Sequence, residues 1–123
     1  MAAGLARTLG AKLTALYVIA PYSPARTGGA FALMPGYQRV VIEQARQALS
    51  AFNDEARSQG VAAGTASVVG GEPWQEILRT ARARKCDLIV MASHGRRGLA
   101  GVILGSETRR VLTRSKIPVL VCR

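Results

Sequence analysis

DLIVMASHGRRGLAGVILGS, from Asp87 to Ser106, contains a short apolar run and then a glycine-spaced basic loop. The apolar run from Leu88 to Met91 is typical of a strand buried on both faces of a parallel sheet. The residues from Glu107 to Arg114 predict a helix behind the loop. A strand, a glycine loop and a helix start in this order direct backbone N–H groups and the helix dipole toward an anion, most often a phosphate.

The composition of the loop supports this interpretation but does not settle it. Its glycines allow the backbone to approach a ligand closely; they are Gly95, Gly98, Gly101 and Gly105. Ser106 is expected as the N-cap of the helix, and Arg96 and Arg97 are placed to meet phosphate charge. The spacing matches neither the Walker A nor the dinucleotide pattern. A flexible surface loop before an ordinary capped helix is therefore an equally weighted alternative.

Strand and helix patterns alternate along the rest of the chain. Helices are predicted over Ala2 to Leu9, over Tyr37 to Gln59 and from Pro73 onward, and strands over Lys12 to Ala20, Val61 to Val69 and Ile117 to Cys122. The last two strands are expected at sheet edges, because Gly64 and Pro118 weaken them. The segment from Tyr22 to Gly36 predicts a long loop with a lid or binding role. This alternation indicates one α/β domain over residues 1–123 with a parallel sheet and right-handed crossovers.

Composition narrows the classes of function. The 123 residues are 49% hydrophobic, and 17 basic against 7 acidic residues give a net charge of +10. The basic residues are scattered and lack interleaved aromatic residues, so a solvated arginine-rich surface is favoured over a nucleic-acid interface. Apolar runs fall short of the ~20 residues that span a bilayer, and the N-terminus has no secretory pattern. We expect a soluble, cytoplasmic protein that does not bind membranes.

The sequence predicts neither a metal site nor a catalytic residue. Cys86 and Cys122 lack metal-ligand spacing and are expected as buried, reduced thiols. His94 stands in the loop as a candidate base or phosphate contact, but no serine, cysteine or carboxylate is arranged as its partner. A binding function is therefore favoured over an enzymatic one.

Taken in order, these segments resemble the universal stress protein family. The matching stretches are LTALYVIAP, GEPWQEIL, CDLIVMASHGRRGL, LGSETRRVL and IPVLVCR, and they extend over nearly the whole chain. The resemblance implies a Rossmann-like fold, similar to the adenine-nucleotide alpha hydrolases, with helices on both faces of an open parallel sheet. The family's strand order is 3-2-1-4-5.

ATP-binding members of the family carry the signature Gly-x2-Gly-x9-Gly-Ser/Thr. Its positions fall here on Ala92, Gly95, Gly105 and Ser106. Three of the four match, and Ala92 adds a methyl group where the signature has glycine. The resemblance implies ATP, accompanied by Mg²⁺, as a regulatory ligand at the 92–106 loop, with at most slow hydrolysis. Val18 is implied as an adenine contact and Ser106 to Thr108 as phosphate contacts. The full candidate site is Val18, Met91, Ala92, His94, Gly95, Arg96, Arg97, Gly98, Gly105, Ser106, Glu107 and Thr108.

Family members begin with a strand that carries a nucleotide-binding aspartate, whereas this sequence starts within the family's first helix. We therefore expect a domain that is N-terminally truncated relative to the family. If the chain folds alone, the strand at residues 13–19 is expected to pair directly with that at 88–91, in the order 3-2-4-5. There are two alternatives. A strand from another chain fills the place of the missing strand, or the natural protein starts upstream of Met1.

The resemblance also implies a homodimer through the last strand, made by Val119, Leu120, Val121 and Cys122. A competing hypothesis for function is a dimeric stress-response scaffold that binds no nucleotide. Ala92 and the absent first strand favour the scaffold, whereas the retained glycines, Ser106 and the arginine pair favour nucleotide binding.

Overall fold

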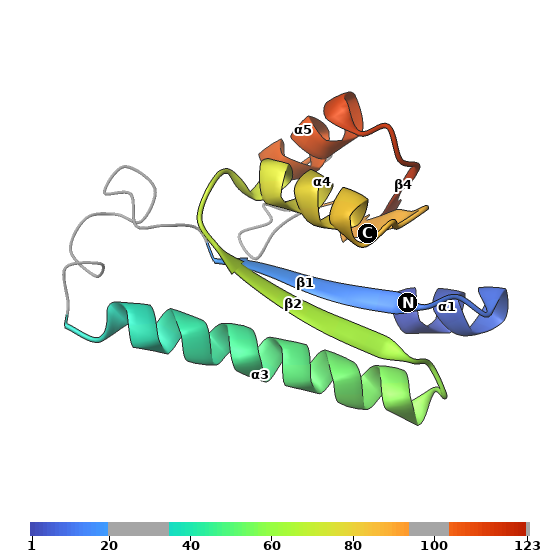
Figure 1. The fold of residues 1–123 in the computed structure, drawn as a ribbon, viewed down its shortest axis with the longest axis horizontal. Coiled ribbons are helices and arrows are strands. Elements are labelled where there is room, and N and C mark those ends of the chain that lie inside the picture. The colour runs from blue at the N-terminus through green and yellow to red at the C-terminus, as the bar shows by residue number, and fades with distance from the viewer. Residues whose placement is uncertain (20–34, 94–103, 123) are drawn as a thin grey trace. The chain divides into compact units, whose positions relative to one another are not determined.

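The computed structural model describes residues 1–19, 35–93 and 104–122 (Figure 1). The chain divides at a glycine pair into two compact units, which are the N-terminal unit, Met1–Gly70, and the C-terminal unit, Gly71–Arg123. Gly70 and Gly71 both have positive φ angles, 135° and 58°, a region that L side chains rarely adopt.

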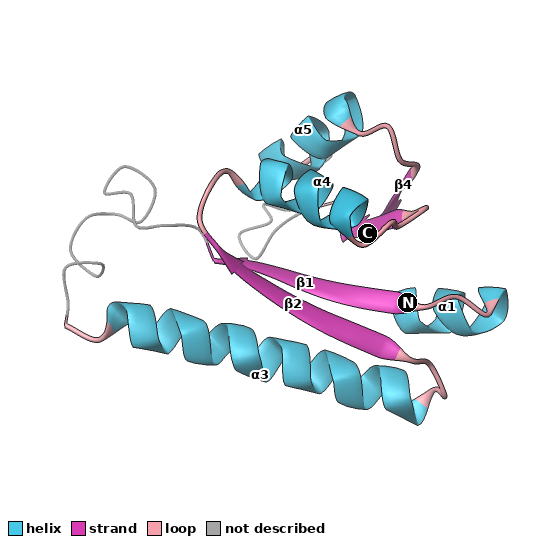
Figure 2. Ribbon diagram, viewed as in Figure 1, coloured by secondary structure: helices cyan, strands magenta, loops and turns pink. Residues whose placement is uncertain are grey.

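In the N-terminal unit, one long helix packs along a two-stranded parallel sheet (Figure 2). The sheet pairs β1 (Leu13–Ile19) with β2 (Ala63–Val69), and the long helix is α3 (Tyr37–Ser58). The short helix α1 (Ala2–Leu9) ends at Gly10, whose left-handed conformation is a common helix stop. One buried cluster consists of small side chains, namely Ala3, Ala6, Ala56 and Val61. Ile19 and Ala45 are also buried in this unit.

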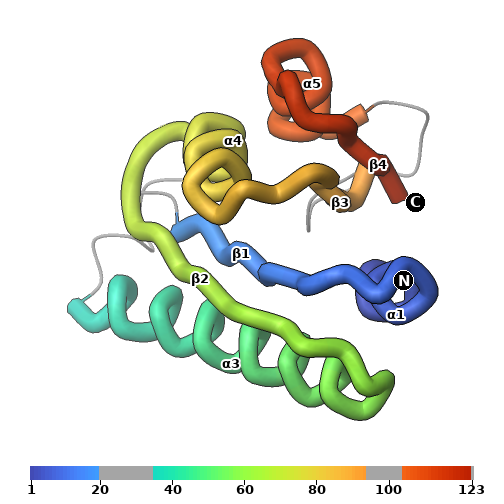
Figure 3. The backbone as a smooth tube through the Cα atoms, turned by 45° about the vertical axis from the view of Figure 1, so that its right-hand side comes forward, coloured from blue at the N-terminus to red at the C-terminus, as the bar shows by residue number. Residues whose placement is uncertain are grey.

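In the C-terminal unit, two helices pack together beside a second parallel pair of strands (Figure 3). The helices are α4 (Pro73–Ala83) and α5 (Ser106–Arg114), and the strands are β3 (Ile89–Ala92) and β4 (Val119–Cys122). Leu78 and Ala81 of α4, Ile89 of β3 and Val111 of α5 form its buried core. Pro73 occupies the first turn of α4, where its missing N–H costs nothing.

The predicted order of helices and strands is confirmed, as is the parallel α/β class. Cys86 and Cys122 are free, but both are half-buried and not buried as expected. Two of the predicted strands begin two residues later than expected. The N–H of Val61 donates to the carbonyl of Ala56 at 2.9 Å and so closes the turn that follows α3, and β2 begins at Ala63. The N–H of Ile117 donates to the hydroxyl of Ser115 at 3.0 Å, so β4 begins after Pro118.

The expected direct pairing of residues 13–19 with residues 88–91, in the order 3-2-4-5, is wrong. Among the described strands, β1 pairs with β2 and β3 pairs with β4, giving two sheets of two strands. Each observed ladder joins strands separated by one helix in the sequence, whereas the expected ladder would join the two units. The two segments of the expected ladder fall on opposite sides of the glycine pair that divides the chain, and each strand pairs within its own unit.

Most of the loop predicted from Tyr22 to Gly36 lies outside the described residues, because only Pro35 and Gly36 are described. Within the described part of the chain, none of the helices combines the length and the apolar character that crossing a membrane requires.

Candidate functional site

The first turn of α5 is fixed to the carboxyl end of β3 by two hydrogen bonds. The N–H of Gly105 donates to the carbonyl of Ser93 at 2.8 Å, and the hydroxyl of Thr108 donates to the carbonyl of Ala92 at 3.0 Å. Thr108 is only 3% exposed. Ser93 is in turn anchored, because its N–H donates to the carbonyl of Cys122 at 2.7 Å. The beginning of the helix is therefore held in place by the sheet itself.

The N-cap of α5 is Gly105, with φ −55° and ψ 148°, and not Ser106 as the sequence predicted. Serine and glycine are both common N-cap residues. Here the hydrogen bond from the N–H of Gly105 to the carbonyl of Ser93 holds Gly105 directly before the first turn, so Gly105 takes the N-cap position. The first intrahelical bond runs from the N–H of Arg109 to the carbonyl of Gly105. Ser106 is thus the first residue of the helix, and its side chain does not cap it.

The first turn of α5 offers a set of backbone donors. No side-chain cap satisfies the N–H groups of this turn among the described residues, and the first N–H groups of any helix lack partners within it. These are the N–H groups of Ser106, Glu107 and Thr108. Together with the positive end of the helix dipole, such donors form a site suited to an anion such as phosphate.

The side chains of Glu107 and Thr108 are engaged elsewhere. Thr108 binds the carbonyl of Ala92, as described above. One carboxylate oxygen of Glu107 accepts the N–H of Trp74 at 3.0 Å, and the other accepts from the Nη1 of Arg110 at 3.1 Å. Arg110 also donates to the carboxylate of Glu72 at 2.7 Å. Glu107 and Thr108 are therefore available to an anion through their backbone N–H groups rather than through their side chains.

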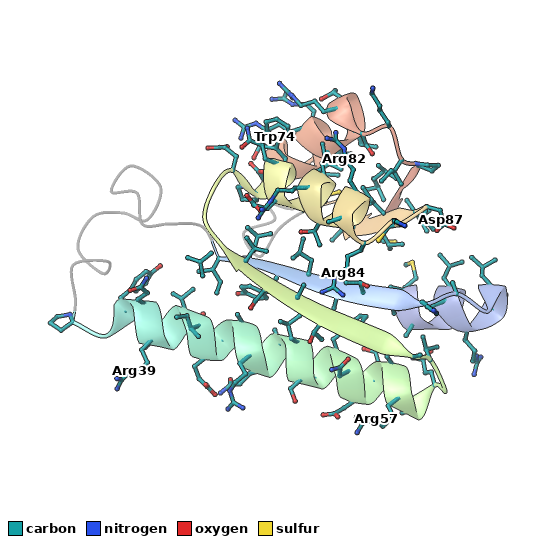
Figure 4. All side chains as sticks on the ribbon, viewed as in Figure 1. Arg39, Arg57, Trp74, Arg82, Arg84 and Asp87 are labelled. Carbon is teal, nitrogen blue, oxygen red and sulfur yellow. The ribbon has the colours of Figure 1, made fainter. Side chains whose placement is uncertain are left out.

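Trp74 lies in the first turn of α4 (Figure 4), where it combines two contacts. Its side chain packs against the core of the C-terminal unit, and the guanidinium of Arg114 lies 4.7 Å from the ring centre. This distance permits a cation–π interaction. Trp74, Arg110 and Arg114 thus join the beginning of α4 to α5.

The structure brings some of the predicted site residues together and does not describe others. Met91, Ala92, Gly105, Ser106, Glu107 and Thr108 are brought together where β3 ends and α5 begins. The side chain of Ala92, the departure from the ATP signature, is exposed. Val18 lies in β1 of the N-terminal unit, paired in register with Val68. His94, Gly95, Arg96, Arg97 and Gly98 lie outside the described residues.

The described residues form no group of three or more histidine, cysteine or acidic side chains that could hold a metal ion. Sequence reasoning missed the contacts of Glu72 and Arg110. Their one local signal is the three-residue spacing of Glu107 and Arg110, which suits an ion pair on a helix. Glu72 is 38 residues from Arg110, so no local pattern indicates that contact.

Comparison with known proteins gives a consistent result. The model of the Universal stress protein family matches residues 1–123. Universal stress protein MJ0531 of Methanocaldococcus jannaschii is 32% identical over 124 residues, which cover 99% of this chain and 71% of that protein. The solved structure of MJ0577 from the same organism is similar with a TM-score of 0.77 and 26% identity, covering 98% of this chain and 83% of that one. A universal stress protein solved in complex with cAMP is 27% identical, with a TM-score of 0.61 and coverage of 99% and 81%.

Proposed function

Since the chain belongs to the universal stress protein family, we propose that it binds an adenine nucleotide as a regulatory ligand, with the phosphates at the beginning of α5. One observation carries this proposal. The N–H donors of the first turn of α5 are fixed at the carboxyl end of β3 by the bonds of Gly105 and Thr108. Ligands of open parallel sheets bind at the carboxyl ends of the strands.

ATP is the ligand that the signature at Ala92, Gly95, Gly105 and Ser106 favours, and the similar protein solved with cAMP supports the adenine class. Mg²⁺ would accompany the phosphates rather than occupy a site of its own, since the described residues hold no acidic cluster. We propose a cytoplasmic location, where ATP is available, and a binding rather than a catalytic role.

A thermal melt with and without excess Mg-ATP tests the function directly. A ligand at about 100 times its dissociation constant adds ~2.7 kcal/mol to the folded state, which raises the midpoint by several degrees in a domain of this size. Adenosine and cAMP titrated beside ATP separate the contribution of the phosphates from that of the base. A cooperative melt that none of these ligands moves would favour the nucleotide-free scaffold instead.

Ser106→Glu places a carboxylate on the exposed first residue of α5. Acidic residues are favourable in the first turn of a helix, so the fold should be retained. Binding of ATP should be lost, because the new carboxylate occupies the donors and repels phosphate. Thr113→Glu is the matched control, since it adds the same charge to an exposed position near the other end of α5. Equal ATP binding by both variants would contradict this location of the phosphates.

We propose further that β4 mediates a homodimer through Val119 to Cys122. Among the described strands, β4 pairs only with β3, and Leu120 remains 39% exposed. Val121→Pro removes one N–H donor from β4, and Leu120→Lys adds a charge to its exposed face. The molar mass in solution, measured by light scattering, should fall from that of a dimer to that of a monomer in both variants. A monomeric wild-type protein would refute the dimer.

A further inference from the structure

Glu107 brings a negative charge into the same helical turn that offers N–H donors to an anion. It is the second residue of α5, directly after Ser106. An uncompensated carboxylate there would repel a bound phosphate. Both oxygens of Glu107 are instead engaged by other groups, the N–H of Trp74 and the guanidinium of Arg110.

The N–H of Trp74 is the group in α4 that needs an external acceptor. Pro73 has no N–H, and the N–H groups of Gln75 and Glu76 both donate to the carbonyl of Glu72, at 2.9 and 3.2 Å. The N-cap Glu72 makes no side-chain cap, and the carboxylate of Glu107, 33 residues away, accepts from Trp74 instead. One side chain of α5 therefore completes the first turn of α4.

Arg110 holds this arrangement together. It lies one turn after Glu107 on α5 and donates both to Glu107 and, at 2.7 Å, to Glu72 beside α4. The three charged side chains of this Arg110 network, Glu72, Glu107 and Arg110, are partly exposed, so their strength as surface ion pairs is modest. Their geometric effect is larger, because they set where the carboxylate of Glu107 lies.

We propose that Arg110 is a positioning residue for nucleotide binding, because it keeps the carboxylate of Glu107 on the first turn of α4 and its charge compensated. This inference rests on the proposed function. Without Arg110, the carboxylate is free to approach the N–H donors of its own helical turn and competes there with phosphate. Arg110 itself need not touch the ligand.

Binding measurements on charge variants test this role. Arg110→Met should weaken ATP binding about five- to tenfold and leave adenosine binding unchanged, because only ATP carries phosphate charge. Glu107→Gln combined with Arg110→Met should restore most of the ATP affinity, since the competing charge is then gone. Arg109→Met is the matched control, as Arg109 is an exposed neighbour on α5 with no carboxylate partner among the described residues. It removes the same charge and should change ATP affinity less than twofold.

An Arg110 that binds the phosphates directly predicts a different pattern, because the double variant would then remain as weak as Arg110→Met. That result, or unchanged ATP binding by Arg110→Met, would overturn the positioning role.

Amide hydrogen exchange provides a readout without nucleotide. The N–H of Trp74 should exchange faster in Glu107→Ala and in Arg110→Met than in the wild type, whereas the N–H of Gln75, bonded to its own helix, should change little. If the wild type binds no ATP, the proposed function fails, and faster exchange at Trp74 still supports the control of Glu107 by Arg110. Equal exchange in wild type and variants would refute that control whether or not ATP binds.

Discussion

The two units are stabilised in different ways. In the N-terminal unit, the β1–β2 ladder has seven residue pairs, and the described side-chain hydrogen bonds within α1 and α3 join residues three or four apart. In the C-terminal unit, the β3–β4 ladder has four pairs, and side-chain bonds join residues 16, 33 and 38 apart. Where the backbone ladder is short, polar side chains fix the relative positions of the helices and strands. The candidate site lies in that unit.

The core of the C-terminal unit is the place where one substitution should have the largest effect. Val111 of α5 is 0% exposed and packs against buried residues of α4 and β3, so Val111→Asp buries a charge without a partner. We expect a loss of about 4 kcal/mol or more in the free energy of unfolding, measured by urea denaturation. Leu112→Asp, on the exposed side of the same helix, is the control and should cost far less.

Hydrogen exchange on the same variant tests whether the units differ. Amides of β3 and β4 should lose more protection in Val111→Asp than amides of β1 and β2. A uniform loss of protection over all four strands would show that the two units unfold as one.

A smaller loss is expected in the core of the N-terminal unit. Ala56 is 0% exposed and belongs to one buried cluster with Ala3, Ala6 and Val61, so a larger side chain would press against these neighbours. Ala56→Leu should destabilise the protein by about 1–3 kcal/mol through overpacking. Ala51→Leu changes an exposed position of the same helix and should be nearly neutral. A stabilising Ala56→Leu would reveal unfilled space in this core.

The smallest effect concerns the surface of α3. Hydrogen bonds from Arg46, at 2.9 and 2.7 Å, and from Gln47 lower the pKa of Glu43 below its usual value of 4.5. Because the pKa of Glu43 is lower in the folded state, the ionised carboxylate stabilises the fold at pH values above the pKa of the unfolded state. This contribution is lost as the pH falls through the pKa of the folded state. Glu43→Gln should therefore slightly flatten the acid limb of the stability curve, measured by denaturation from pH 6 to about pH 3. Arg46→Gln should flatten it similarly, and an effect of one variant alone would argue against the pair.

Much of the fold follows from local signals in the sequence. Local signals predicted the helices in their order. These signals include the apolar spacing in α3 and α4, Pro73 at a helix start and Gly10 at a helix end. Of the expected strand pairs, β1–β2 and β3–β4 are observed, and only the pairing of β1 with β3 was predicted incorrectly. Likewise, Gly105 and Ser106 are both good N-caps, and the contact of Gly105 with Ser93 distinguishes them.

The candidate site was predictable in position but not in detail. The glycine loop and the helix behind it predicted an anion site at the beginning of α5, and this site is part of the proposed function. The carboxylate of Glu107 accepts a hydrogen bond from the N–H of Trp74, which is 33 positions away in the sequence. This contact can be predicted only if the packing of α4 against α5 is known. The contact of Arg110 with Glu72 depends on the same packing. Long-range polar contacts of this kind leave little trace in a single sequence.

Trp74 is the single tryptophan of the chain. Its indole lies against the guanidinium of Arg114, and its backbone N–H is held by Glu107, the neighbour of the first residue of α5. The intrinsic tryptophan emission of this protein therefore arises from one place, the junction of α4 and α5. The molecule carries a built-in optical probe beside its candidate site, and no extrinsic label is needed to follow that junction.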